Sequence, residues 1–145
     1  MSYIGTEISV VAQKPAAEDQ SGYESLSTTV IGKVVSSSEM GDQHQDQSST
    51  LLKDGRTKHA NGAADGGDIN VTIDGEDYTD AGLAIIEEAN GTNVEHSFKF
   101  EGPEQTRYVY GVVRNLRTNT FDTQTKSGLT FTISVNSGIT RVAAD

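Results

Sequence analysis

The sequence has no cysteine and no tryptophan, and only two of its 145 residues are proline. The absence of cysteine excludes disulfides, thiolate metal ligands and cysteine nucleophiles together. No apolar run approaches the ~18 residues that span a bilayer, so membrane insertion is not expected. The first residues, Met1–Glu7, lack the basic and apolar regions of a signal peptide. These absences favour a protein that folds in the cytoplasm.

Apolar residues are also scarce, because only 34% of the chain is hydrophobic and 6% is aromatic. The length suits a single domain, but this composition supplies a thin core. Part of the chain is therefore expected to be unpacked when the molecule is alone, and its stability is expected to depend on neighbours.

Positive charge is limited to 11 Lys and Arg against 21 Asp and Glu, which gives a net charge of −10. A protein that grips DNA needs clustered cations to displace the counterions of the phosphates. This chain repels a duplex on average, so specific DNA binding is not expected.

The pattern of apolar residues predicts one helix and several strands. A helix is expected from Thr79 or Asp80, as N-cap, to the stop at Asn90-Gly91. Gly32 indicates a bulge or a close backbone approach within the first predicted strand. Strands are predicted over 28–35, 69–73, 94–101, 107–114 and 129–135, and the fourth of these, apolar on both faces, is expected to be central.

These elements predict a mainly β (α+β) fold. Two packed antiparallel sheets are expected to form a β-sandwich or small barrel with one flanking α-helix, a long polar loop and an N-terminal arm. Residues 1–145 are expected to be one domain, with the arm over 1–22 and the loop over 36–67. Within the arm, the apolar run Ile8-Ser-Val10-Val11 could form a short strand, and the segment from Lys14 to Gly22 is expected to be extended. On composition alone, the loop is either a disordered insertion or a functional segment.

The residue types that carry catalysis are not gathered in any recognisable pattern. The three histidines are far apart in the sequence, and His96, on the apolar face of a strand, is expected to be a buried core or interface residue. Asp42, His44 and Asp46 would share one face of a strand and could hold a metal, but their Gln and Ser neighbours favour a solvated segment. We predict no enzyme activity, no catalytic residue, no metal and no cofactor.

Several short segments occur in a familiar order and spacing. In that order and spacing, the chain resembles the major tail tube proteins of long-tailed, non-contractile (siphovirus-like) bacteriophages and of gene transfer agents, which are related in fold to type VI secretion tube proteins. The segments are Val30-Ile-Gly-Lys-Val-Val35, Leu52-Lys-Asp-Gly-Arg56, Asp80-Ala-Gly82, Phe98-x-Phe100-x-Gly102, Tyr110-Gly-Val-Val113 and Phe131-Thr-Ile-Ser-Val-Asn-Ser-Gly138.

The resemblance implies a virion structural protein that self-assembles into hexameric rings, stacked into a hollow tail tube. It implies assembly in the cytoplasm of a bacterial host, with tape-measure, tail terminator and baseplate or tip proteins as partners. Double-stranded DNA would pass through the lumen into the host cell without being specifically bound. The resemblance also implies that the long loop and the arm bridge to neighbouring subunits, and no C-terminal immunoglobulin-like domain is expected after Asp145.

Two sets of candidate residues follow from this resemblance. Contacts between subunits or rings are expected from the long loop, at Gln43, His44, Asp46, Lys53, Arg56 and Lys58. Acidic side chains on a lumen wall would repel phosphate and keep a duplex centred. The candidates for that wall are Glu95 and Glu101, which share a polar strand face with Lys99; the same face could equally be the solvated outside.

Two other functions remain open from the sequence. The first is a tube subunit of a secretion system, which has the same fold but carries protein effectors. The second is a monomeric β-sandwich binding module, which normally exposes aromatic residues on loops. Here only Phe121, Tyr23 and Tyr78 are expected to be free of the strands.

Overall fold

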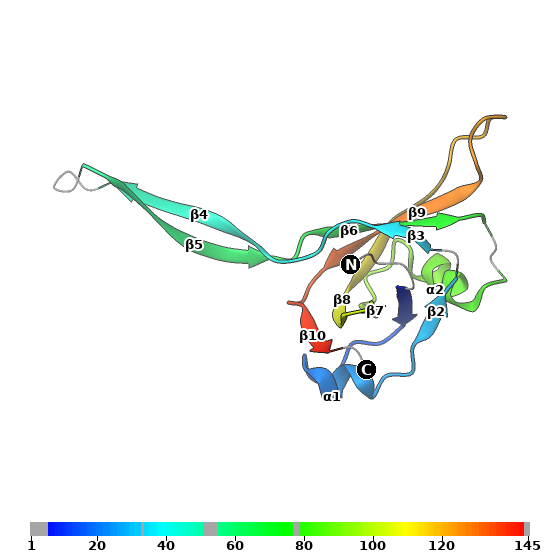
Figure 1. Cartoon of the computed structure of the whole chain (residues 1–145), viewed down its shortest axis with the longest axis horizontal. Coiled ribbons are helices and arrows are strands. Elements are labelled where there is room, and N and C mark those ends of the chain that lie inside the picture. Colours follow the sequence, from blue (N-terminus) through cyan, green and yellow to red (C-terminus); the bar gives the residue numbers. More distant parts are fainter. Residues whose placement is uncertain (1–5, 33, 51–54, 77–78, 144–145) are drawn as a thin grey trace.

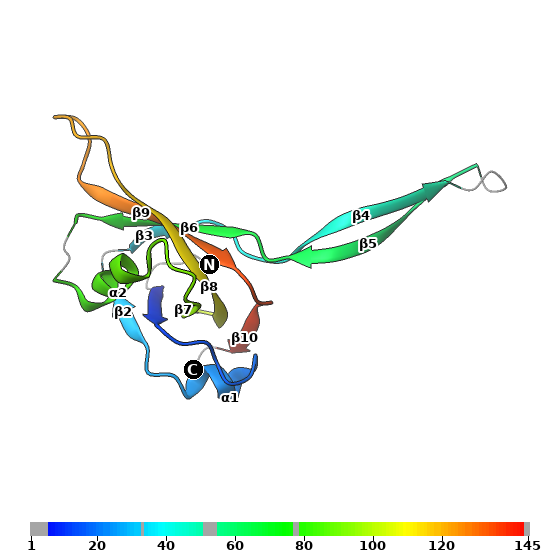
Figure 2. The same ribbon diagram turned by 180° about the vertical axis from the view of Figure 1, so that it is seen from behind.

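The structure is a computed structural model that describes residues 6–32, 34–50, 55–76 and 79–143. Within these residues the chain forms a body of antiparallel strands from which one long hairpin extends (Figures 1 and 2). Its helices are α1 (Gln20–Glu24) and α2 (Ala81–Ala89). Its strands are β1 (Glu7–Val11), β2 (Thr29–Ile31), β3 (Val34–Ser37), β4 (Gln43–Thr50), β5 (Thr57–Asp65), β6 (Asp68–Asp74), β7 (His96–Glu101), β8 (Gln105–Thr118), β9 (Gly128–Val135) and β10 (Thr140–Ala143).

The body is one continuous sheet with the strand order β2-β1-β7-β8-β9-β6-β3, and β10 adds to β8. The long strand β8 joins two parts of this sheet. Its residues 106–111 pair with β7, and its residues 111–118 pair with β9. We call β2, β1, β7, β10 and the first part of β8 the β7 half-sheet. The second part of β8, with β9, β6 and β3, is the β9 half-sheet.

The two half-sheets must fold over one another, because the terminal strands of the path follow each other in the chain. Strand β2 ends at Ile31 and β3 begins at Val34, so these two ends are at most ~11 Å apart at 3.8 Å per residue. A flat sheet with this order would separate them by about 29 Å, at ~4.8 Å between strands. The sheet therefore closes on itself, and the predicted mainly β class with a sandwich of antiparallel strands is confirmed.

One apolar core fills the space between the half-sheets. Both half-sheets and α2 contribute side chains to this single cluster, which explains how a chain with few apolar residues closes a body. The largest fully buried members are Val10, Ile69, Val71, Ile73, Leu83, Ile86, Phe98, Val109, Leu129, Phe131 and Ile133. Burying each of them fully stabilises the fold by about 1.5–3 kcal/mol.

Strand β8 is buried on both faces along its first part, as its sequence predicts. Val109 lies in the main core, whereas Tyr108 and Tyr110 point to the other face and form a second cluster with Tyr23 of α1. The rings of Tyr23 and Tyr108 stack with their centroids 5.0 Å apart. Tyr23 is therefore not the free aromatic residue that the sequence suggested, and α1 is a second helix that was not predicted.

Helix α2 matches its prediction and lies against the corner where the sheet closes. Asp80 is its N-cap, and the Asp80 carboxylate accepts hydrogen bonds from the backbone N–H groups of Leu83 (3.3 Å) and Gly32 (3.0 Å). Gly82 allows the helix to approach β2 closely, since a Cβ atom there would lie 2.5 Å from the Val30 carbonyl oxygen. The bulge or close backbone approach predicted at Gly32 is not found there, because a Cβ atom at Gly32 would meet only the Asp80 carboxylate at an ordinary 3.6 Å. Instead, the predicted strand 28–35 is divided into β2 and β3, which lie at opposite ends of the strand order.

The predicted N-terminal arm is largely part of the body. Strand β1 pairs with β2 on one side and β7 on the other, and its Ile8 and Val10 are buried in the core. Residues after β1 are also held, because the Ser97 hydroxyl donates to the Gln13 carbonyl oxygen (2.5 Å). Burial of these two apolar side chains and pairing with the edge of β7 both stabilise β1 on the body. Residues 1–5 lie outside the described residues.

The segment predicted as a long polar loop over 36–67 is also mostly ordered structure. It contains the end of β3 and both strands of the hairpin β4–β5. It is polar as expected, but it is neither disordered nor an irregular loop in the residues that the structure describes. Backbone pairing, rather than apolar burial, defines these two strands.

Candidate functional site: the hairpin arm and the polar sheet face

The hairpin formed by β4 and β5 is the feature that departs most from a compact domain. We call residues 43–65 the hairpin arm. Its strands pair from Gln43↔Asp65 at the base to Thr50↔Thr57 near the tip, a length of about 27 Å at ~3.4 Å per residue. Every β4 and β5 side chain that the structure describes is exposed, and the arm extends away from the body (Figures 1 and 2).

The base of the arm is fixed to the β9 half-sheet. Gly66 lies so close to the end of β9 that a Cβ atom would meet a Val135 methyl group at 2.7 Å. Gly67, with φ of 70°, turns the chain into β6, and its carbonyl oxygen accepts from the Val135 N–H at 2.9 Å. The Gly67 N–H in turn donates to the Asp65 carboxylate (2.9 Å). The arm therefore leaves the body in a defined direction.

On the described part of the arm, Asp46 of β4 and His59 of β5 form a side-chain pair between the strands. Both carboxylate oxygens of Asp46 lie within hydrogen-bond distance of His59 Nδ1, at 2.8 and 2.9 Å. The strand register shifts between His44 and Asp46, and this bulge is what brings Asp46 within reach of His59. His59 has no local sequence signal for this pair, because the strand register decides its partner.

The predicted inter-subunit residues lie along this arm. Gln43 and His44 are at its base, paired with Asp65 and Ala64. Asp46 follows, and Lys58 pairs with Ser49 further out on β5. Arg56 is exposed just before β5 begins, whereas Lys53 lies outside the described residues. The arm thus carries Gln43, His44, Asp46 and Lys58 on one projecting element, spread along its length.

A second surface is the outward face of the β9 half-sheet, which we call the polar face. The Thr132 hydroxyl donates to Asn70 Oδ1 (2.8 Å), and the Ser134 hydroxyl donates to Asp68 Oδ1 (3.0 Å). The described helices pack elsewhere, α2 against β1, β2 and β8 and α1 against β10, and leave this face uncovered. Its side chains are Asp68, Asn70, Thr72, Thr130, Thr132 and Ser134.

Acidic groups lie at both ends of the polar face. Asp68 is the first residue of β6, at the end next to the arm. Asp74 is the last residue of β6, and its carboxylate forms an ion pair with the Lys126 ammonium at 3.1 Å. Two exposed cations of β8 border this face, with Arg114 opposite Thr132 and Arg117 opposite Thr130. The sequence predicted the alternation of apolar and polar residues in β6 and β9, and this alternation implies a polar face. The sequence did not indicate that the described helices leave this face exposed.

The predicted lumen candidates belong to the other half-sheet. Glu95 is half-buried just before β7, and Glu101 is exposed at the end of β7, where Lys99 lies 3.3 Å from its carboxylate. The outer face of this half-sheet is partly covered by α1 and by the segment that precedes it. Nearby His96 is buried, as expected, with Nδ1 3.0 Å from the Val94 carbonyl oxygen.

The covering segment is fastened by a charged hydrogen bond. The Tyr110 hydroxyl donates to Glu18 Oε1 at 2.6 Å, and the Lys14 ammonium lies 5.0 Å from the centre of the Tyr110 ring. The hydrogen bond to Glu18 raises the pKa of Tyr110 to about 12, with burial and the charge of Glu18 as further causes. Burial also raises the pKa of Tyr23. This cluster holds residues 13–19 against β8 and offers no nucleophile–base pair.

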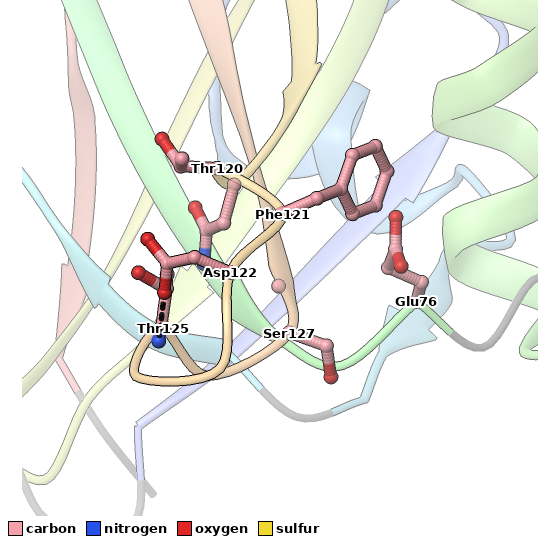
Figure 3. A pocket seen from close by; sticks show the side chains of 8 residues that line it. Glu76, Thr120, Phe121, Asp122, Thr125 and Ser127 are labelled. Carbon is pink, nitrogen blue, oxygen red and sulfur yellow. Dashed lines mark hydrogen bonds between the residues drawn. The ribbon is translucent and has the colours of Figure 1, made fainter.

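The tip between β8 and β9 has a shallow hollow of about 180 Å³ (Figure 3). Asp122 accepts from the N–H groups of Gln124 and Thr125, and the Thr125 hydroxyl, followed by these two backbone bonds, lowers the pKa of Asp122. The ring of Phe121 lies on the same side of the loop as Glu76 (Figure 3), and Phe121 is 86% exposed. The hollow is small and open to solvent, which is typical of a turn and not of a ligand site.

In the described part of the chain, no three His, Asp or Glu side chains are close enough together to hold a metal ion. None of the described helices is long and apolar enough to cross a membrane. Neither a scan against protein-family models nor a search of curated proteins finds a match to this chain.

Proposed function

We propose that this chain is the structural subunit of a phage or gene transfer agent tail tube. Subunits would assemble into hexameric rings, and the rings would stack into a tube that conducts double-stranded DNA into the host cell. The hairpin arm is the observation that carries the proposal, together with the family resemblance of the sequence. Tape-measure, terminator and baseplate or tip proteins are the partners that such a tube requires.

The arm supports assembly because contacts within its own chain stabilise it only weakly. A two-stranded hairpin alone is marginal in water, and the described side chains of the arm bury no apolar surface against the body. Its outer strand edges present backbone N–H and C=O groups that another chain can pair with. A neighbouring subunit that receives the arm would supply the missing contacts.

The polar face supports a lumen wall. Its hydroxyl groups donate to Asn70 and Asp68 across the strands, and Asp68 places negative charge at the end near the arm. The strands β6 and β9 of this wall contain no Lys or Arg that would hold a duplex, and the cations Arg114 and Arg117 lie along its β8 edge. We therefore propose the polar face as the lining, in preference to the partly covered face of Glu95 and Glu101.

The experiment removes the arm and leaves the body intact. Residues 43–65 are replaced by a short glycine linker, which can close the gap because Gln43 and Asp65 are paired neighbours. The variant should unfold cooperatively in urea like the full chain but form no tubes by negative-stain electron microscopy, whereas the full chain forms rings or striated tubes.

A mixing experiment separates loss of the arm from loss of folding. A folded subunit without its arm, added to the full chain, should join growing tubes and shorten them in proportion to its fraction. Tubes of normal length from the armless variant alone would contradict the role of the arm. A full chain that remains monomeric even beside an initiator complex would contradict the tube and favour the binding module.

A further inference from the structure

Two arginine side chains stand side by side on one flank of the body. Arg107 of β8 and Arg141 of β10 are directly opposite one another in the strand pairing, so both side chains point to the same face. Arg141 is exposed and Arg107 is half-buried beside Phe100, its neighbour on β7. Neither guanidinium has an ion pair with any residue that the structure describes.

This arrangement is unfavourable in an isolated subunit. Like charges placed directly opposite in a sheet destabilise the strand pair, and β10 is a short terminal strand that depends on β8 for its pairing. Two adjacent guanidinium groups form a binding surface for carboxylates, which they contact through paired N–H donors. The position therefore favours an acidic partner from outside the subunit.

A matching acidic pair lies on the opposite flank. Glu87 and Glu88 are exposed on α2, and no described cation pairs with them. Helix α2 packs on β2 and β1, at one end of the strand order β2-β1-β7-β8, and its C-terminal end also lies against the second part of β8, where the Gly91 N–H donates to the Val113 carbonyl oxygen. Strand β10 pairs with the first part of β8 and continues the order at the other end. Figures 1 and 2 show α2 and β10 on different sides of the body.

We propose that Arg107 and Arg141 of one subunit bind Glu87 and Glu88 of the next subunit in the same ring. This contact is head-to-tail, since two different flanks meet, and repetition of a head-to-tail contact closes into a ring when its rotation permits. The inference rests on the proposed function and names the lateral contact within it. The second copy of the chain is the occupant that the charges favour.

The test reverses the charge of each flank separately. One full-length variant carries Arg107→Glu and Arg141→Glu, so that both of its flanks are acidic. The other carries Glu87→Arg and Glu88→Arg, so that both of its flanks are basic. Each variant alone should need at least a tenfold higher concentration than the wild type to form rings in sedimentation and negative-stain images.

Mixing the two variants gives the decisive result. In an equimolar mixture every contact can join an acidic flank to a basic one, and a ring with an even number of subunits can alternate. The mixture should therefore form rings, as should one chain that carries all four reversals. Neither result can come from variants that fail to fold.

A matched control uses a like-charge pair elsewhere on the surface. Glu7 and Glu101 are also directly opposite one another, but Lys99 already pairs with Glu101. The variant Glu7→Arg should assemble like the wild type and should not rescue the acidic-flank variant. Ring formation by the wild type should also weaken as salt is raised, and Arg107→Gln with Arg141→Gln should remove most of that dependence.

The outcomes distinguish this inference from the proposed function. If the wild type forms rings and the reversed variants do so equally well, the lateral contact lies elsewhere and the tube proposal stands. If the separate variants fail and their mixture also fails while both are folded, the pairing of these two flanks is wrong. If the wild type itself forms no ring beside an initiator complex, the tube proposal fails.

Discussion

Asp80 holds two elements together with one carboxylate, and its replacement should cost more than the loss of a helix cap. Its Oδ2 atom accepts from the Leu83 N–H, which caps α2, and from the Gly32 N–H, which follows β2. Both hydrogen bonds are partly buried. The first is local in sequence, whereas the second closes the corner between the two ends of the sheet.

The two contributions can be estimated separately. An Ala at an N-cap position costs about 1 kcal/mol, and a partly buried N–H left without its acceptor costs about 1–3 kcal/mol. Asp80→Ala should therefore lower the free energy of unfolding by about 2–4 kcal/mol. Asp80→Asn keeps an acceptor oxygen in place and loses only the charge at the helix N-terminus, about 0.3–1 kcal/mol.

Asp80→Ser separates the two hydrogen bonds. The shorter serine side chain can still cap Leu83 but is too short to replace the bond to Gly32, so its effect should fall between those of Asn and Ala. Urea unfolding of each variant, at two protein concentrations so that assembly does not contribute, measures these differences. An Ala variant within about 0.5 kcal/mol of the wild type, the usual range for surface substitutions, would refute this reasoning.

Two further changes test other parts of the body. Because Glu18 raises the pKa of Tyr110 to about 12, the stability from this bond is present below about pH 10 and is lost as the pH rises toward 12. The urea midpoint should therefore fall less in Tyr110→Phe than in the wild type between about pH 9 and pH 11.5, and equal falls would argue against the bond. Gly82→Ala should destabilise by about 1–3 kcal/mol through its clash with the Val30 carbonyl, although alanine favours helices by ~1 kcal/mol; a more stable Gly82→Ala would show that α2 can move away.

The parts of the fold that could be predicted are those whose signal is local. The alternation over Ile69–Ile73 and over Leu129–Val135 reflects burial on one face, and both segments are strands as expected. Asp80 at the start of α2 was recognisable because a cap is defined by its nearest neighbours. Its bond to Gly32, 48 residues away, has no local signal.

The predictions that were wrong failed for a different physical reason. Residues 28–35 have the composition of one strand, and only the closure of the sheet places β2 and β3 at its opposite ends. The hairpin arm has no apolar alternation, because both of its faces are in water, so periodicity cannot reveal it. The candidate residues on the arm were found by resemblance, but the pair Asp46–His59 depends on a register shift that composition does not encode.

The polar sequence of the arm bears on how assembly could be controlled. A long exposed hairpin with apolar side chains would pair with any other sheet edge and aggregate. The arm described here satisfies much of its backbone by its own strand pairing and keeps its described side chains in water. It can therefore remain exposed on a monomer at little cost until a surface of the right shape covers it. In the proposed tube, the small net gain of each arm would make growth depend on several contacts at once, which favours addition at an existing ring over spontaneous association of free subunits.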